Sequence, residues 1–167
     1  MLLEKMTWQT LAKEVLVQLE IKLGSEQAAI FYDEARIKVI GAGEGSGKSY
    51  LGALYLLCRS MYDYLMWGPQ LYWIVGGDFE DTRAELGDFG KEEFLLGWLE
   101  RLGFLDRDAS SISRDAGQPC ILHTKHDITG HIYKTVSGYD PTKLGREEPM
   151  GLIGCEVSRW DEEVFNR

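Results

Sequence analysis

The chain has 167 residues and a formal net charge of −9, with 44% apolar and 27% charged residues. Its length suits one domain with a single core, and its composition is ordinary for a globular protein, which excludes a disordered or fibrous chain. Because sequence-independent DNA binding requires lysine and arginine to neutralise phosphates, any contact with nucleic acid must be local or supplied elsewhere. Alternatively, the acidity only keeps the chain in solution.

The sequence carries no sign of membrane insertion or secretion. Its richest apolar stretch, residues 51–67, is interrupted by charged side chains, whereas a membrane span needs about 18 apolar residues in a row. The N-terminus lacks the apolar block and cleavage site of a signal peptide. Cys58, Cys120 and Cys155 lie far apart without a CxxC pair, which argues against a disulfide framework or a zinc site and favours a reducing cytosol.

Two helices are predicted at the N-terminus. Apolar residues recur at helical spacing from Thr7 to Leu23, and Gly24 follows where a helix commonly ends. Ser25 is a suitable cap for a second helix that runs to about Glu34. The first of these helices is amphipathic, and we treat residues 1–24 as a segment separate from the domain that follows.

The next segment has the order strand, glycine-rich loop, helix. A β-branched run at residues 37–40 is followed by the glycine-rich residues 41–49 and then by a helical pattern over residues 51–61. Residues 71–75 form a second apolar run that ends in glycines, and residues 81–102 read as a helix weakened by glycines.

The rest of the chain predicts strands separated by loops. Residues 106–118 are polar and lack periodicity, so we expect a loop, and strands are expected at residues 120–123 and 131–136. Another loop, residues 137–149, precedes a short apolar run at residues 151–155. The alternation of helices and strands predicts an α/β architecture.

The glycine-rich loop has the composition of a phosphate site. Gly43, Gly45 and Gly47 allow left-handed turns and leave room for backbone N–H groups to approach a triphosphate. Lys48 is placed to reach the β- and γ-phosphates, and the hydroxyl of Ser49 to ligate Mg²⁺ at the start of a helix. We therefore expect ATP and Mg²⁺ as ligands.

The loop departs from the usual pattern G-x-x-x-x-G-K-[ST] at one position, since Ala42 occupies the place of the first glycine. A chance glycine-rich turn is the competing interpretation. The surrounding strand and helix signals favour a phosphate loop, whose predicted nucleotide-binding residues are Gly43, Glu44, Gly45, Ser46, Gly47, Lys48 and Ser49.

A catalytic carboxylate is expected at the end of a buried strand near the phosphate loop. Glu156 follows the apolar run 151–155 and is the preferred candidate to activate the attacking water, while Cys155 stands where a metal-side aspartate is usual. The metal would then be held by Ser49, phosphate oxygens and water. Asp161 and Glu162 are the alternative acids, and a third interpretation makes all of them solvated surface groups.

Taken together, Gln27, residues 42–49, residues 153–156 and the acidic run 161–165 resemble the ATPase domain of the large terminase subunits of tailed bacteriophages. The likeness covers roughly residues 25–167. It implies a RecA-like P-loop NTPase fold of the ASCE class, with a mainly parallel sheet flanked by helices. It further implies that Lys48 and Ser49 hold Mg-ATP, that Lys48 and Glu156 are catalytic, and that Gln27 contacts the adenine.

The same resemblance implies ATP hydrolysis that powers translocation of viral DNA into a procapsid. The partners would be double-stranded DNA, the portal protein and the small terminase subunit, with the chain in a homo-oligomeric ring in the cytoplasm of an infected bacterial cell and no membrane contact. Because the chain ends soon after Glu156, we expect an incomplete ATPase domain without a nuclease domain. The alternatives are a nucleic-acid-dependent helicase or related P-loop ATPase, and a non-catalytic nucleotide-binding module.

The histidines, two arginines and the tryptophans are weaker signals, each with a simpler structural explanation. Three histidines and Asp127 lie close in sequence, but residues of a hairpin alternate faces, so a metal cluster is not expected. Arg83 and Arg146 are candidate arginine fingers, although surface arginines are commoner. The tryptophans mostly fall in apolar runs, which favours core packing or a subunit interface. The histidines are His123, His126 and His131, and the tryptophans Trp8, Trp67, Trp73, Trp98 and Trp160.

Overall fold

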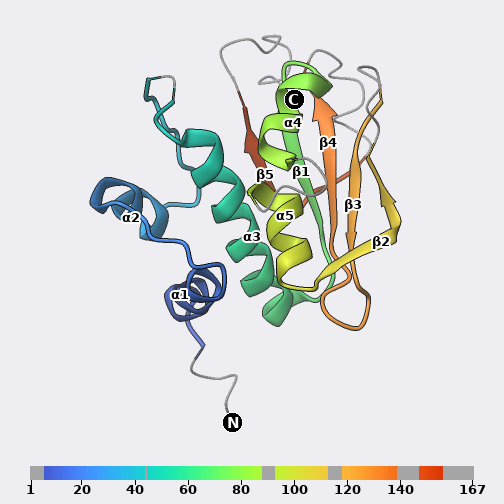
Figure 1. Ribbon diagram of the computed structural model, residues 1–167, viewed down its shortest axis with the longest axis horizontal. Coiled ribbons are helices and arrows are strands. Elements are labelled where there is room, and N and C mark those ends of the chain that lie inside the picture. Colours follow the sequence, from blue (N-terminus) through green and yellow to red (C-terminus); the bar gives the residue numbers. More distant parts are fainter. Residues whose placement is uncertain (1–5, 44, 88–92, 113–117, 139–146, 156–167) are drawn as a thin grey trace.

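The computed structural model describes residues 6–43, 45–87, 93–112, 118–138 and 147–155, and Figure 1 shows their arrangement. The helices are α1 (Trp8–Gln18), α2 (Ser25–Tyr32), α3 (Lys48–Trp67), α4 (Phe79–Leu86) and α5 (Phe94–Arg101). The strands are β1 (Leu71–Gly76), β2 (Leu105–Ser111), β3 (Ile121–Thr124), β4 (Ile132–Ser137) and β5 (Gly151–Gly154).

The strands form one five-stranded mixed sheet in the order β2-β3-β4-β1-β5. Strand β1 pairs in parallel with β4 and β5, whereas β3 pairs antiparallel with β2 and β4. The chain is therefore α/β, compatible with a Rossmann-like arrangement, but the expected mainly parallel sheet is limited to the β4-β1-β5 part. The β3–β4 pair is antiparallel because the connection between these strands is short, and a parallel pair needs a longer crossover connection.

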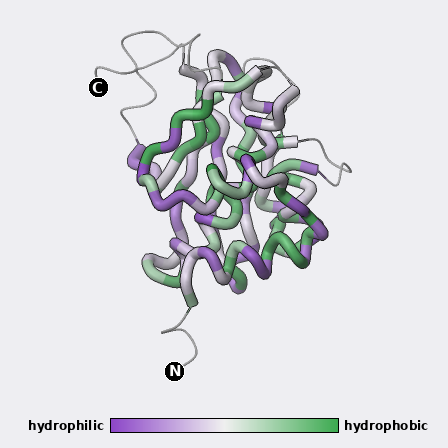
Figure 2. Tube along the Cα trace, turned by 90° about the vertical axis from the view of Figure 1, so that its left-hand side faces the viewer, coloured by the Kyte–Doolittle hydropathy of each residue, from purple (hydrophilic) through white to green (hydrophobic). Residues whose placement is uncertain are grey.

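Helix α3 lies between the sheet and the two N-terminal helices (Figure 1). Its buried side chains share one core with alternate residues of β1, namely Tyr72 and Ile74. The intervening residues Trp73 and Val75 form a second cluster with Val136 on the opposite face of the sheet. Burial on both faces explains why β1 is apolar throughout. In Figure 2 apolar and polar residues alternate along the helices, as elements with one buried face require.

Helix α1 ends earlier than the apolar periodicity predicted. Glu20 adopts a left-handed conformation with φ +55°. Its N–H donates to the carbonyl of Val17, and that of Ile21 donates to the carbonyl of Leu16, which closes the helix as a Schellman motif. The carboxylate of Glu20 also pairs with Arg101 at 2.7 Å. Gly24 is accordingly not the end of α1 but the N-cap of α2.

The β-branched run at residues 37–40 is not a strand, which corrects the prediction. Ile37 and Val39 are 80% and 93% exposed. Between them Lys38 turns inward, and its Nζ donates to the carbonyls of Ile30 (2.9 Å) and Phe31 (3.0 Å) in the last turn of α2. This tether holds the segment against helices instead of the sheet, and it satisfies carbonyls that a helix end leaves unpaired.

Two further predictions fail in the middle of the chain. The helix expected over residues 81–102 is divided into α4 and α5, because Gly87 takes φ +87° and a Cβ there would lie 3.1 Å from the carbonyl oxygen of Glu93. The expected loop at residues 106–118 instead contains most of β2. This strand lies at the sheet edge and is polar, as edge strands commonly are.

The remaining elements agree with the sequence. Strands β1, β3, β4 and β5 fall on the predicted runs to within about a residue at each end, and the helix expected at residues 51–61 lies within α3. Trp8, Trp73 and Trp98 are buried, as predicted, whereas Trp67 is 65% exposed; Trp160 lies outside the described residues. Within the described residues, no helix combines the length and apolar character that crossing a bilayer requires.

Candidate phosphate-binding site

The glycine-rich loop enters α3 through two left-handed glycines. Gly45 has φ +73° and Gly47 has φ +81°, a region that residues with a Cβ rarely occupy. The N–H of Ser46 donates to the carbonyl of Gly43 at 3.3 Å, and the N–H of Leu51 donates to the carbonyl of Gly47 at 2.9 Å, which begins the helix. The conformational role predicted for glycine is confirmed at Gly45 and Gly47.

Lys48 is the first residue of α3, and its side chain folds back over the loop. The Nζ atom donates to the carbonyl of Ala42 at 2.8 Å and to that of Gly43 at 2.9 Å. The ammonium group therefore lies against the loop backbone, while its contact with phosphate stays a prediction. Ser49 follows in the first turn of the same helix and is partly exposed.

The loop leaves space beside its backbone. A Cβ atom built on Gly43 or on Gly45 would meet no atom within 4 Å. The loop also precedes the N-terminus of a 20-residue helix, where N–H groups without intrahelical partners and the positive end of the dipole favour an anion. Open space, backbone N–H groups and one lysine ammonium suit a phosphate group, so the described residues fit the predicted ligand.

Gln27 lies beside this loop although it is far away in sequence. Its Oε1 accepts a hydrogen bond from the N–H of Gly24 at 3.1 Å. Its Nε2 would lie 3.2 Å from a Cβ built on Gly47. The structure thus brings Gln27 and the loop together, while the adenine contact stays a prediction.

Several predicted site residues cannot be placed. Glu44, Glu156 and Arg146 lie outside the described residues, as does the alternative acidic pair at 161–162. Cys155 is described: it is 8% exposed, belongs to the main core, and its N–H donates to the carbonyl of Val75 at 2.8 Å. A backbone bond from just beyond β5 to the central strand fixes the chain immediately before Glu156.

The minor candidates that the structure describes lie in separate elements. Arg83 lies in the last turn of α4. The part of the chain that the structure describes contains no group of three histidine, cysteine, aspartate or glutamate side chains arranged to hold a metal ion. His131 is buried, and both ring nitrogens have partners. Its Nδ1 accepts from the N–H of Gln70 at 2.9 Å, and its Nε2 lies 3.0 Å from the carbonyl oxygen of Ser60.

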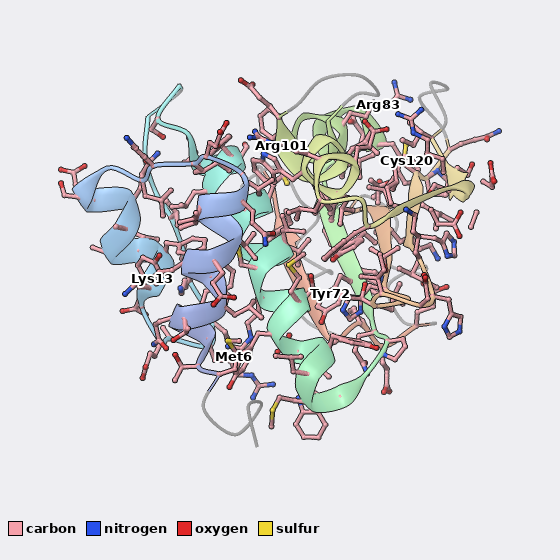
Figure 3. All side chains as sticks on the ribbon, turned by 60° about the horizontal axis from the view of Figure 1, so that its bottom comes forward. Met6, Lys13, Tyr72, Arg83, Arg101 and Cys120 are labelled. Carbon is pink, nitrogen blue, oxygen red and sulfur yellow. The ribbon has the colours of Figure 1, made fainter. Side chains whose placement is uncertain are left out.

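Sequence reasoning missed a polar network that fixes the second half of α3. The hydroxyls of Ser60 and Tyr133 lie 2.6 Å apart, and the hydroxyl of Tyr72 donates to Asp63 at 3.3 Å. Tyr72 lies between α3 and the strands (Figure 3). Burial raises the pKa values of Asp63, Tyr72 and Tyr133, and the pKa of Asp63 is lowered again by Arg59 at 3.0 Å. The available signal was a serine and an aspartate three residues apart in an apolar helix.

Lys38 was also missed, because its neighbours suggested a strand. Its Nζ lies 4.0 Å from the centre of the Tyr55 ring in addition to its bonds to α2. Burial lowers the pKa of Lys38, and the charge of Asp33 opposes this effect. By tying α2 to α3, Lys38 fixes the segment that leads into the phosphate loop.

No family model, curated protein or solved structure matches the chain. What the fold and the site define is an α/β protein with a five-stranded mixed sheet and a glycine-rich, lysine-containing loop at the N-terminus of its central helix.

Proposed function

We propose that the chain binds ATP with Mg²⁺ at residues 42–49 and hydrolyses it. The observation that carries this proposal is the position of Lys48. Its ammonium group is held at 2.8 and 2.9 Å by carbonyls of its own loop, directly beside the left-handed Gly45 and Gly47. A lysine ammonium group beside a glycine-rich loop at a helix N-terminus supports the proposal, because backbone N–H groups and positive charge there both favour a phosphate.

Each residue has a task in the proposed reaction. Lys48 exchanges its two carbonyl contacts for oxygens of the β- and γ-phosphates, and backbone N–H groups of the loop bind the remaining oxygens. Ser49 would hold Mg²⁺, which neutralises charge on the phosphates when it is bound. Glu156, at the end of the segment fixed by Cys155, orients the attacking water and accepts its proton.

We further propose that hydrolysis powers translocation of double-stranded viral DNA into a procapsid, with the chain acting as the ATPase part of a large terminase subunit. The support is the order of the sequence motifs together with the placement of Gln27 beside the loop. In this proposal the chain works in a homo-oligomeric ring with the portal protein and the small terminase subunit, in the cytoplasm of an infected bacterium.

One observation favours a second function. Cys155 is buried in the core at the place where a metal-side carboxylate is usual, so this position supplies no acidic metal ligand. The second candidate function is therefore a module that binds a nucleotide without hydrolysing it. ATP turnover measured alone, with double-stranded DNA and with purified procapsids separates the two functions, since the module binds ATP and releases no phosphate under any of the three conditions.

The Lys48→Ala variant tests the phosphate site. Loss of a charge-assisted hydrogen bond should weaken binding of a fluorescent ATP analogue by about 1.5–3 kcal/mol, or roughly 10- to 150-fold. Lys125→Ala is the matched control, because Lys125 also donates to a backbone carbonyl, that of Gly103 at 2.7 Å, but at a turn of the sheet. Equal affinity for the analogue in a folded Lys48→Ala protein contradicts the proposal.

A further inference from the structure

The side chain of Gln27 has two ends with different surroundings. Its Oε1 accepts from the N–H of Gly24, the N-cap of α2, at 3.1 Å. This is the reaching-back bond of a capping box, in which a residue at the third helical position satisfies the N–H of the N-cap residue. The bond also fixes the orientation of the amide, because only the oxygen can accept.

The other end of the same amide faces the phosphate loop. A Cβ on Gly47 would lie 3.2 Å from Nε2, tighter than ordinary van der Waals contact, so the amide packs directly against the backbone of Gly47. Gly47 has φ +81° and immediately precedes Lys48 in the chain. The amide therefore packs on the residue through which the loop enters α3.

We propose that Gln27 is a positioning residue that ties the N-terminus of α2 to the phosphate loop, and that its effect on ligand binding is independent of the nucleobase. The loop's other contacts are local, from Lys48 and Ser46 within the same segment, and a Cβ on Gly43 or Gly45 would meet nothing within 4 Å. The amide oxygen is bonded to the N–H of Gly24, and the amide nitrogen packs against the backbone of Gly47. A residue that reads adenine would instead need both amide groups for the edge of the base.

This inference concerns the proposed nucleotide site, but its first test needs no nucleotide. Amide hydrogen exchange of residues 45–51 in the ligand-free protein reports how often the loop opens. Gln27→Ala should raise exchange there by about five-fold, the factor that loss of one capping interaction typically brings. Gln27→Glu has nearly the same shape and still accepts from Gly24, so it should restore protection of the loop.

Gln9→Ala is the matched control, because Gln9 also bridges two segments, with its Nε2 donating to Glu34 at 2.9 Å, but without a contact to the loop. It should leave exchange of residues 45–51 unchanged. If Gln27→Ala raises exchange only within α2, or not at all, Gln27 does not position the loop and the inference is overturned.

The second test uses ATP, GTP and inorganic triphosphate as probes, titrated by calorimetry. A positioning role predicts that Gln27→Ala weakens all three by the same factor. If only ATP affinity is lost, Gln27 recognises the adenine base, and the inference is overturned. If the unmodified chain binds none of the three probes, the proposed function fails, whereas the exchange experiment still decides the role of Gln27.

Discussion

The two ends of α3 have opposite surroundings. At its N-terminus the helix follows an open loop, where Lys48 bonds to two carbonyls of that loop. In its second half Ser60 and Asp63 are buried and bonded to tyrosines of β4 and β1. One helix thus joins an exposed glycine-rich segment to the most firmly packed part of the sheet.

This contrast shows how the fold combines rigidity with access. A binding loop needs exposed N–H groups and therefore has low local stability, so its geometry has to come from the scaffold behind it. Variants at the loop end of α3 should change ligand binding and leave the free energy of unfolding almost unchanged. Variants at the buried end should do the reverse.

The largest expected effect is on turnover. Glu156 is the acid proposed to activate the water that attacks ATP bound at the loop end of α3. Glu156→Gln keeps shape and hydrogen bonding but cannot accept a proton, and ATP hydrolysis should fall by at least about 10²-fold while ATP still binds. Phosphate release and analogue binding measure the two properties.

Asp161→Asn and Glu162→Gln are the controls for that experiment, and both should retain turnover. If Glu156→Gln still hydrolyses ATP and one of these two does not, the alternative acidic pair carries the reaction. Loss of ATP binding in Glu156→Gln would place this side chain in the binding site instead of beside the attacking water.

A smaller effect, on the free energy of unfolding, is expected at the buried end of α3. Tyr133→Phe removes a hydroxyl 2.6 Å from that of Ser60, which keeps its bond to the carbonyl of Leu57 at 2.8 Å. The free energy of unfolding, measured by urea denaturation, should fall by about 0.5–1.5 kcal/mol, the usual net value of one hydrogen bond. Affinity for the ATP analogue should not change.

Tyr64→Phe on the same helix is the control, because Tyr64 is only partly buried, its ring packs against His131, and its hydroxyl forms no hydrogen bond among the described residues. Its stability should match that of the unmodified chain. A Tyr133→Phe variant that keeps full stability but loses ATP affinity would contradict the proposed division between the two ends of α3.

The sequence predicted those parts of the fold that follow from local patterns. Strand β1 was found because a central parallel strand is apolar on both faces, and the edge strand β5 was found from its short apolar run beside glycines. The left-handed glycines of the loop were found because only glycine adopts such turns without cost. Lys48 lies at the start of α3 with its ammonium group against the loop, and its role at phosphate stays a prediction.

The errors come from interactions between segments far apart in sequence. The run 37–40 has the composition of a strand, but the bond from Lys38 to α2 draws it away from the sheet. Strand β2 was missed because an edge strand carries charges that look like a loop. No periodicity reveals that Glu20 closes α1 through a left-handed turn, or that Gln27 contacts Gly47.

The smallest expected effect is a dependence of stability on pH that belongs to the buried end alone. His131 is 1% exposed, and burial lowers its pKa, an effect that the bond to the carbonyl of Ser60 opposes. Because Nδ1 accepts from the N–H of Gln70, the neutral ring must carry its proton on Nε2, facing the carbonyl of Ser60. Protonation of Nδ1 would set two N–H groups against each other.

The unfolded chain therefore binds this proton more readily than the folded chain. Stability due to neutral His131 is complete above the unfolded pKa of about 6.5 and is lost as pH falls from there toward the lower folded pKa. Urea unfolding between pH 7.5 and 5.5 should show this decline, and His131→Asn, which keeps an acceptor near Gln70 but does not titrate, should flatten it. His126→Gln, at an exposed turn, should keep the decline of the unmodified chain. Should His131→Asn decline as steeply as the unmodified chain, another group titrates, and the buried end of α3 is not the source of the pH dependence.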